Sequence, residues 1–226
     1  MTESKIVDLA PSGADRTAER LAAVPGIRRA PTPKLEQYML PGFLDPATCA
    51  ALIDQIDRDV RPSTIADPNG DDAFRTSTTC DLDHRDPLVS TVNTRLHDLT
   101  GIPLEYGEPL QGQRYDVGQQ FKAHTDYFDP HGADWETYCA VPGQRSWTLM
   151  VYLNQPGAGG ATRFLATAKM HQPETGKLLA WNNVRADGQP NADTLHHGMK
   201  VRKGRKYIIT KWFRERPWPW AEGELG

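Results

Sequence analysis

Apolar residues in the first half of the chain recur at helical spacing in two segments. Asp45-Pro46 and Asp86-Pro87 each place a capping carboxylate before a proline, which is a common start of a helix. The first start is followed by an apolar stripe at positions 49, 52, 53, 56 and 60. The second is followed by a stripe at positions 88, 89, 92, 96 and 99, which ends near Gly101. This pattern predicts two helices, each with one buried face.

From Leu110 onward the pattern changes to short alternating segments separated by Gly, Pro, Asn or Asp, which is typical of strands and turns. The expected strands cover residues 35–40, 114–115, 119–124, 147–153, 161–164, 176–181, 196–201 and 206–214. Helices followed by antiparallel strands predict a mainly β fold with flanking helices, of the sandwich or jelly-roll type. Residues 61–83, which include Pro68-Asn69-Gly70-Asp71, are predicted to be a loop. Residues 127–145 are long enough for a lid or a binding loop.

The chain of 226 residues fits one domain with a sizeable core. Residues 1–34 are rich in Ala, Pro, Arg and small polar residues, with a weakly helical patch around residues 17–24. We therefore expect an N-terminal extension over residues 1–34, part of it a candidate for disorder, and a single domain over residues 35–226.

Charge and cysteine content exclude several classes of partner and compartment. The formal net charge of −3 gives no overall attraction to nucleic acid or to an anionic membrane. Cys49, Cys80 and Cys139 show no metal-binding or disulfide spacing and are expected to be buried thiols in a reducing compartment. No secretory signal and no run of about 18 apolar residues is present. The sequence predicts a soluble cytoplasmic protein and says little about its oligomeric state.

The most informative motif is His124-Thr125-Asp126, which lies in a segment that alternates like a strand. Side chains two apart on a strand point the same way, so an imidazole and a carboxylate converge there. Two His and one carboxylate form the facial triad that holds Fe(II) and leaves the opposite positions open. The pair alone is weak evidence, because a salt-bridged surface His gives the same motif.

A third ligand is available at His196 or His197, which open a later strand. Adjacent residues on a strand face opposite ways, so only one of them can point inward. Ten residues after His196, beyond a turn at Lys203-Gly204, Lys206 begins an alternating strand-like segment. A buried ammonium is costly unless it receives an anion, so Lys206 either binds a carboxylate or extends into solvent from a strand edge.

Taken together, the ordered motifs resemble the core of prolyl 4-hydroxylase-type Fe(II)/2-oxoglutarate dioxygenases. The resemblance covers roughly residues 35–216. It rests on these segments: Gly42-Phe43-Leu44 with Cys49, Arg75-Thr76-Ser77, Arg114-Tyr115-x-x-Gly118, His124-x-Asp126, Thr148-x-x-x-Tyr152-Leu153-Asn154, Gly159-Gly160-x-Thr162-x-Phe164, Leu195-His196-x-Gly198, Gly204-x-Lys206 and Thr210-Lys211-Trp212-Phe213.

This resemblance implies a double-stranded β-helix, a jelly roll whose mouth holds the iron. His124, Asp126 and His196 would be the metal ligands and catalytic centre, and Lys206 would pair with the distal carboxylate of 2-oxoglutarate. Tyr115 and Thr148 would be hydrogen-bonding groups around this co-substrate. The implied reaction consumes O2 and 2-oxoglutarate, releases succinate and CO2, and hydroxylates an unactivated C–H bond. L-Ascorbate is an additional candidate cofactor.

Two departures from the family pattern concern the third ligand. His197 stands where the family usually has a small residue, and Met199-Lys200 replaces a frequent Cys-Pro. The spacing to Lys206 favours His196 over His197 as the ligand.

The resemblance suggests prolyl residues of a peptide or protein as the substrate. Candidate residues for a peptide groove are Arg75, Trp147, Arg163 and Trp181, although Trp is as often a core residue. The alternatives are a hydroxylase of a free amino acid or small natural product, and a catalytically silent jelly-roll module that binds metal. An open site with three ligands and a matched Lys favours catalysis over a closed structural site.

Overall fold

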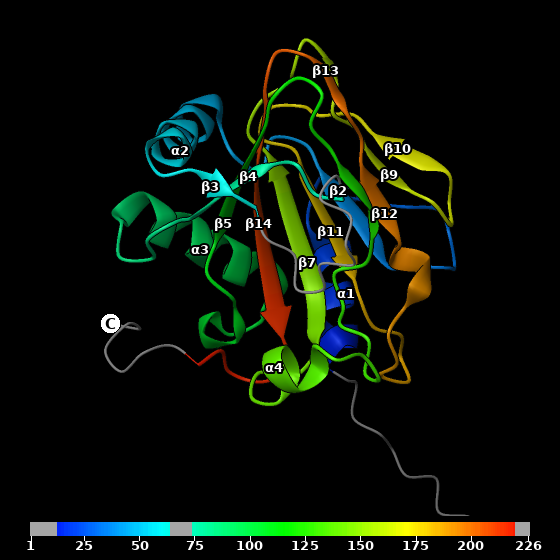
Figure 1. Cartoon of the computed structure of the whole chain (residues 1–226). Helices are drawn as coiled ribbons and strands as arrows, with labels where there is room; N and C mark the ends of the chain where they lie inside the picture. Colours follow the sequence, from blue (N-terminus) through cyan, green and yellow to red (C-terminus); the bar gives the residue numbers. More distant parts are fainter. Residues whose placement is uncertain (1–12, 64–73, 220–226) are drawn as a thin grey trace, which may run out of the picture.

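The structure, a computed structural model, describes residues 13–63 and 74–219. Two antiparallel sheets pack face to face, and helices cover the outer side of the larger sheet (Figure 1). The larger sheet runs in the order β1 (Arg28–Arg29), β2 (Gln37–Leu40), β11 (Leu178–Asn182), β7 (Arg145–Tyr152), β14 (Lys206–Arg214), β5 (Gln111–Tyr115), β4 (Thr78–Asp81), β3 (Arg61–Pro62). The smaller runs in the order β10 (Lys169–His171), β9 (Thr162–Phe164), β12 (His196–Gly198), β6 (Phe121–His124). A short pair joins β8 (Ala158–Gly159) to β13 (Val201–Lys203). The predicted mainly β jelly roll with flanking helices is confirmed.

The two predicted helices begin at the expected caps. Asp45 accepts a hydrogen bond from the backbone N–H of Thr48 at 2.9 Å, and Asp86 accepts one from Leu88 at 2.8 Å. The second helix ends at Gly101, whose φ of 72° is readily adopted by glycine. The helical segments are α1 (Gly13–Ala23), α2 (Pro46–Arg58), α3 (Pro87–Thr100), α4 (Trp135–Cys139) and the 3-10 turns η1 (Leu104–Tyr106) and η2 (Ala192–Thr194).

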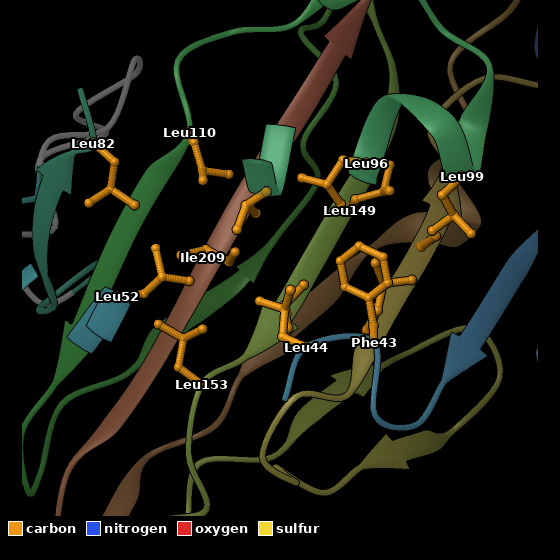
Figure 2. Packing of buried hydrophobic residues seen from close by; sticks show 14 of the residues in the cluster. Phe43, Leu44, Leu52, Leu82, Leu96, Leu99, Leu110, Leu149, Leu153 and Ile209 are labelled. Atoms are coloured by element: carbon orange, nitrogen blue, oxygen red, sulfur yellow. The ribbon is translucent and has the colours of Figure 1, made fainter. Parts of the chain in front are cut away.

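Alternation along the central strands divides the interior into two cores. On β7, Leu149 and Val151 pack toward the helices, whereas Met150 and Tyr152 face the smaller sheet. Figure 2 shows the helix-side core, in which Leu149 and Ile209 belong to the same cluster as Leu52 and Leu96. The side chains that face the smaller sheet surround the interior of the jelly roll, where the candidate site lies.

The prediction of a loop over residues 61–83 was wrong at both ends of this segment. β3 and β4 lie there, and β4 pairs with β5 through Thr78↔Arg114 to Asp81↔Gln111. These strands lack an apolar pattern, and polar contacts take its place: the hydroxyl of Thr79 on β4 lies 2.5 Å from that of Ser63 and accepts a hydrogen bond from Arg75 at 3.2 Å. Residues 68–71, which carried the turn signal, lie outside the described residues.

The described part of the predicted N-terminal extension packs against the domain. Leu21 of α1 is fully buried, and the hydroxyl of Thr17 donates to the carbonyl of Thr100 at the end of α3. β1 pairs with β2. The predicted helical patch at residues 17–24 is confirmed, and the domain boundary at residue 35 stays a prediction.

Two further expectations can be compared with the described residues. Cys49, Cys80 and Cys139 are buried and free, as predicted. Within residues 13–63 and 74–219, no helix has both the length and the apolar character needed to cross a bilayer.

We expect Gly176→Ala to lower the free energy of unfolding by on the order of 3 kcal/mol. Gly176 has a φ of 75°, and a Cβ there would lie 1.9 Å from the carbonyl oxygen of Leu44. The matched control is Gly188→Ala, where φ is 78° but no atom lies within 4 Å, so only about 1 kcal/mol of backbone strain is expected. Urea unfolding of both variants measures the difference, and equal losses would contradict the role given to Leu44.

Candidate active site

Three predicted ligands meet between β6 and β12 of the smaller sheet. His124 lies opposite His196 in the strand register, and Asp126 follows two residues after His124. One ligand atom from each of these residues lies within 4.8 Å of the other two. Among the described residues this is the one such group of three His, Cys, Asp or Glu side chains.

The same backbone contact orients both imidazoles. Nδ1 of His124 lies 2.7 Å from the carbonyl oxygen of Lys122, and Nδ1 of His196 lies 3.0 Å from that of Thr194. A carbonyl only accepts hydrogen bonds, so each Nδ1 carries the proton and each Nε2 keeps its lone pair. Burial, followed by the proximity of His196, holds the pKa of His124 well below its ordinary value. A neutral imidazole is the form that binds a metal.

The two oxygens of Asp126 have different neighbours. Oδ1 lies 3.9 Å from Nε2 of His124, on the side of the imidazoles. Oδ2 accepts a hydrogen bond of 2.8 Å from the hydroxyl of Thr148. Asp126 is 7% exposed and Thr148 is fully buried.

His197 points away from this cluster, as strand alternation requires. It is half-buried and lies beside Arg163 of β9, on the outer face of the smaller sheet. Its Nε2 lies 3.4 Å from the side-chain oxygen of Gln120. Of the two adjacent histidines, the structure therefore brings only His196 to the candidate metal site.

The three ligands and Lys206 line one cavity between the two sheets. The other lining residues are Gln113, Tyr115, Phe121, Met150, Thr162, Trp181, Gly198, Ile208, Thr210 and Trp212. Lys206 is 1% exposed, and burial lowers its pKa to about 7. Its ammonium lies 4.9 Å from the ring centre of Tyr115 and 5.4 Å from that of Tyr152. No carboxylate within the described residues forms an ion pair with it, so an anion that enters the cavity would meet an uncompensated charge.

Tyr115 and Thr148, both predicted to contact the co-substrate, differ in position. Tyr115 lines the cavity, where its hydroxyl donates to Gln113 at 2.8 Å, and burial raises its pKa. Thr148 donates to Asp126 and is not among the lining residues, and its co-substrate contact stays a prediction. Thr162, to which the sequence reading gave no role, lines the cavity instead and hydrogen-bonds the hydroxyl of Tyr152 at 2.7 Å.

The four residues considered for a peptide groove are also separated by the fold. Trp181 lines the cavity and packs edge-on against His196, with 5.0 Å between ring centres. Trp147 faces the helix-side core, and Arg163 lies on the outer face of the smaller sheet. Arg75 lies over the ring of Phe121 at 4.8 Å, next to the cavity.

A buried charge network supports the far side of Asp126. Arg145 donates to the carboxylate of Glu108 at 2.6 and 2.8 Å and to the backbone carbonyl of Asp126 at 3.3 Å. Arg214 pairs with the same carboxylate at 2.6 Å. Burial opposes ionisation of Glu108, but the two guanidiniums outweigh it and hold its pKa below the ordinary value. Arg145 also lies 4.0 Å above the ring of Trp212 at the cavity wall.

A larger hollow of about 680 Å³ lies elsewhere, between α1, the end of α3 and the first residues of β7. It contains none of the predicted site residues, and its charged lining consists of Arg16, Arg20, Arg185, Arg214 and Glu215. The candidate chemistry therefore belongs to the smaller cavity.

The donor set of the cavity fits a ferrous ion. Two imidazole nitrogens and one carboxylate oxygen that line one cavity are typical of non-haem Fe(II) sites. The unpaired ammonium of Lys206 in the same cavity fits a dicarboxylate. The ligand roles of His124, Asp126 and His196 stay predictions.

We expect His196→Ala to weaken Co(II) binding by more than about 100-fold. Loss of a residue that only hydrogen-bonds a metal ligand costs up to roughly that much, and His196 would itself be a ligand. His197→Ala should change the affinity by less than about tenfold, because its imidazole faces outward. Titration of the visible Co(II) absorption bands measures both constants. Loss of binding in His197→Ala with retention in His196→Ala would reverse the assignment.

Comparison with known proteins agrees with this geometry. A family model described as the 2OG-Fe(II) oxygenase superfamily matches residues 110–214. Prolyl 4-hydroxylase 2 of Arabidopsis thaliana is 30% identical over 205 residues, which cover 79% of this chain and 67% of that protein. Prolyl 4-hydroxylase subunit alpha-1 of Rattus norvegicus is 34% identical over 133 residues. That match covers 59% of this chain and 25% of the rat protein, so the chain spans about a quarter of this relative's length.

Solved structures show the same fold. The 2OG complex of a viral collagen prolyl hydroxylase from Paramecium bursaria Chlorella virus-1 has a TM-score of 0.63 and 25% identity, covering 79% of this chain and 95% of that chain. A Pseudomonas putida prolyl-4-hydroxylase has a TM-score of 0.57 and 18% identity, covering 91% of this chain and all of that chain; at this identity the likeness concerns the fold alone. By its motifs, its fold and these relatives, the chain belongs to the 2OG-Fe(II) oxygenase superfamily and is of the prolyl 4-hydroxylase type.

Proposed function

We propose that this chain is an Fe(II)- and 2-oxoglutarate-dependent dioxygenase that hydroxylates prolyl residues of a peptide or protein. The observation that carries this proposal is the cavity itself. It combines His124, Asp126 and His196 with the uncompensated ammonium of Lys206. A dicarboxylate with a 2-oxo group can satisfy both, because one end chelates a metal while the other pairs with Lys206.

The chain's own residues bind and orient the reactants. Lys206 pairs with the distal carboxylate, and the rings of Tyr115 and Tyr152 stabilise its charge from the side. Ile208 and Met150 supply apolar wall that excludes water. When bound, iron, O2 and 2-oxoglutarate supply the oxidative chemistry, which releases succinate and CO2 and transfers one oxygen atom to the substrate.

A prolyl substrate is supported by the family type and by the groups around the cavity. The relatives from Rattus norvegicus and Arabidopsis thaliana are prolyl 4-hydroxylases, and one structural neighbour is a Trichoplax adhaerens prolyl hydroxylase in complex with a hypoxia inducible factor peptide. Trp212 lines the cavity beneath the guanidinium of Arg145, and Arg75 lies beside Phe121. An aromatic ring favours contact with a pyrrolidine ring.

We further propose L-ascorbate as an accessory cofactor and a cytoplasmic location. The family resemblance supports the first, and three free buried thiols support a reducing compartment.

Proline-containing peptides should stimulate succinate release from 2-oxoglutarate and gain one oxygen atom by mass spectrometry. Free proline and a panel of free amino acids should not. The matched control is Asp126→Ala, which removes one of the three ligands and should abolish peptide-dependent succinate release. Oxidation of free amino acids but not of peptides would replace the proposed substrate class, and absence of succinate with every substrate would contradict the dioxygenase assignment.

Binding of 2-oxoglutarate should be coupled to proton uptake above pH 7. Burial lowers the pKa of Lys206 to about 7, so the amine of the free protein is mostly neutral at pH 8. The bound carboxylate favours the ammonium form of Lys206 and raises its pKa. The apparent affinity for 2-oxoglutarate should therefore fall by up to about tenfold per pH unit above pH 7. Below pH 7, Lys206 is protonated in both states and should not affect the pH dependence.

Calorimetric titration of the Mn(II)-loaded protein at pH 8, in two buffers of different ionisation enthalpy, measures this proton uptake. Lys206→Arg stays protonated throughout and should lose it, whereas Lys206→Met should lose most of the affinity. Equal proton uptake in wild type and Lys206→Arg would place the titrating group elsewhere.

A further inference from the structure

Behind Asp126, three buried polar side chains from separate segments form a single hydrogen-bonded row. The side-chain nitrogen Nδ2 of Asn183 donates to Oγ1 of Thr148 at 2.8 Å. The same hydroxyl donates to Oδ2 of Asp126 at 2.8 Å. Asn183 and Thr148 are fully buried, so water does not compete for either bond.

The chemistry of the three groups determines the direction of these hydrogen bonds. An ionised carboxylate only accepts, so the single proton of the Thr148 hydroxyl goes to Asp126. The hydroxyl oxygen can then only accept from Asn183, which requires the NH2 group of the amide on that side. In the opposite amide orientation, the oxygen of Asn183 would face the hydroxyl of Thr148. Two acceptors would then compete for its single proton, and the hydrogen bond to Asp126 would be weaker.

Asn183 adopts this orientation although its own oxygen gains nothing from it. Oδ1 of Asn183 is buried and has no hydrogen-bond partner among the described residues. An unpaired buried acceptor is destabilising and uncommon in folded proteins. If Asn183 had a purely structural role, an arrangement with hydrogen bonds to both Nδ2 and Oδ1 would be more stable. In the structure the satisfied atom is Nδ2, which faces Thr148.

The backbone presents Asn183 to Thr148 from a rigid position. Asn183 follows directly after β11, and its N–H donates to the carbonyl of Ser146 on β7 at 2.7 Å. Its own carbonyl accepts from the N–H of Asn191 at 2.8 Å. Trp181↔Thr148 is a paired position of the two strands, so the register fixes Thr148 near the end of β11.

We propose that Asn183 is a positioning residue for the metal centre. Through Thr148, it holds Asp126 with Oδ2 engaged and Oδ1 alone presented to the imidazoles, where Oδ1 lies 3.9 Å from Nε2 of His124. A carboxylate held in this way offers one oxygen to the ion and leaves the remaining positions for the co-substrates. The inference rests on the proposed iron-binding function and adds residues that contact neither metal nor substrate.

Co(II) affinity tests the row, read from the visible absorption bands of the ion in the purified chain. Thr148→Val keeps the shape but removes the hydroxyl, and Asn183→Leu keeps the approximate volume but removes the donor. Each should weaken Co(II) binding by roughly 10- to 100-fold, whereas Thr148→Ser should stay near wild type. The double variant should bind as weakly as Thr148→Val alone, because the two residues act in series.

Asn182→Leu is the matched control on the adjacent residue. The side chain of Asn182 is also buried, but it accepts from the N–H of Val184, and among the described residues no hydrogen bond joins it to Thr148 or Asp126. It should lower the melting temperature without changing Co(II) affinity. If Asn183→Leu does not fold, Asn183→Ala removes the same donor with less volume in the buried space.

The outcomes separate this inference from the proposed function. Folded Asn183 variants with wild-type Co(II) affinity, or a double variant whose losses add, would overturn the positioning role while leaving the metal site intact. A wild-type chain that binds no Co(II) would instead overturn the proposed function and the inference together.

Discussion

The pairing of β12 with β6 is the constraint on which the candidate site depends. This pairing sets His196 opposite His124, although 72 positions separate them in the numbering of the chain. Strand alternation then turns His196 inward and His197 outward, and it points Asp126 toward the same side as His124. A slip of one residue in this register would exchange the two histidines and separate the three ligands.

Two buried charged residues near the site differ in whether an opposite charge lies beside them. Glu108 is fully compensated by Arg145 and Arg214, and this network holds the backbone of Asp126 and the ring of Trp212 in place. Among the described residues, no carboxylate pairs with Lys206, and the faces of two aromatic rings lie beside its ammonium. The first arrangement stabilises a local structure. The second leaves the protein with an anion-binding position that is costly when empty, which is a common property of ligand sites.

Local signals in the sequence were sufficient for part of this structure. The Asp-Pro starts predicted α2 and α3, and the alternation of the last strand predicted β14. The His-x-Asp motif and Lys206 were recognisable because rare polar residues stood in strand-like segments. The same alternation, continued from Lys206 through Ile208 and Thr210 to Trp212, would also have identified these residues as cavity wall.

What the sequence could not show depends on contacts between distant segments. Thr148 meets Asp126 because β7 passes behind it, and no local pattern encodes that approach. Asn183 reaches Thr148 only through the pairing of β11 with β7. β4 was predicted to be loop because most of its side chains are polar, and the hydroxyl of Thr79 finds its partners in Ser63 and Arg75, outside the strand.

The position of Lys206 also bears on how a catalytic cycle would end. In the proposed reaction, the carboxylate that pairs with Lys206 is the end of 2-oxoglutarate that stays unchanged. Succinate therefore keeps the group that binds this ammonium. The 1-carboxylate leaves as CO2 and the 2-oxo carbon becomes the second carboxylate of succinate, so succinate would no longer offer a 2-oxo acid group to chelate the ion. Release of succinate would therefore depend on its weaker binding at the metal and on the ease with which Lys206 gives up its proton. Succinate should for this reason compete with incoming 2-oxoglutarate for the site.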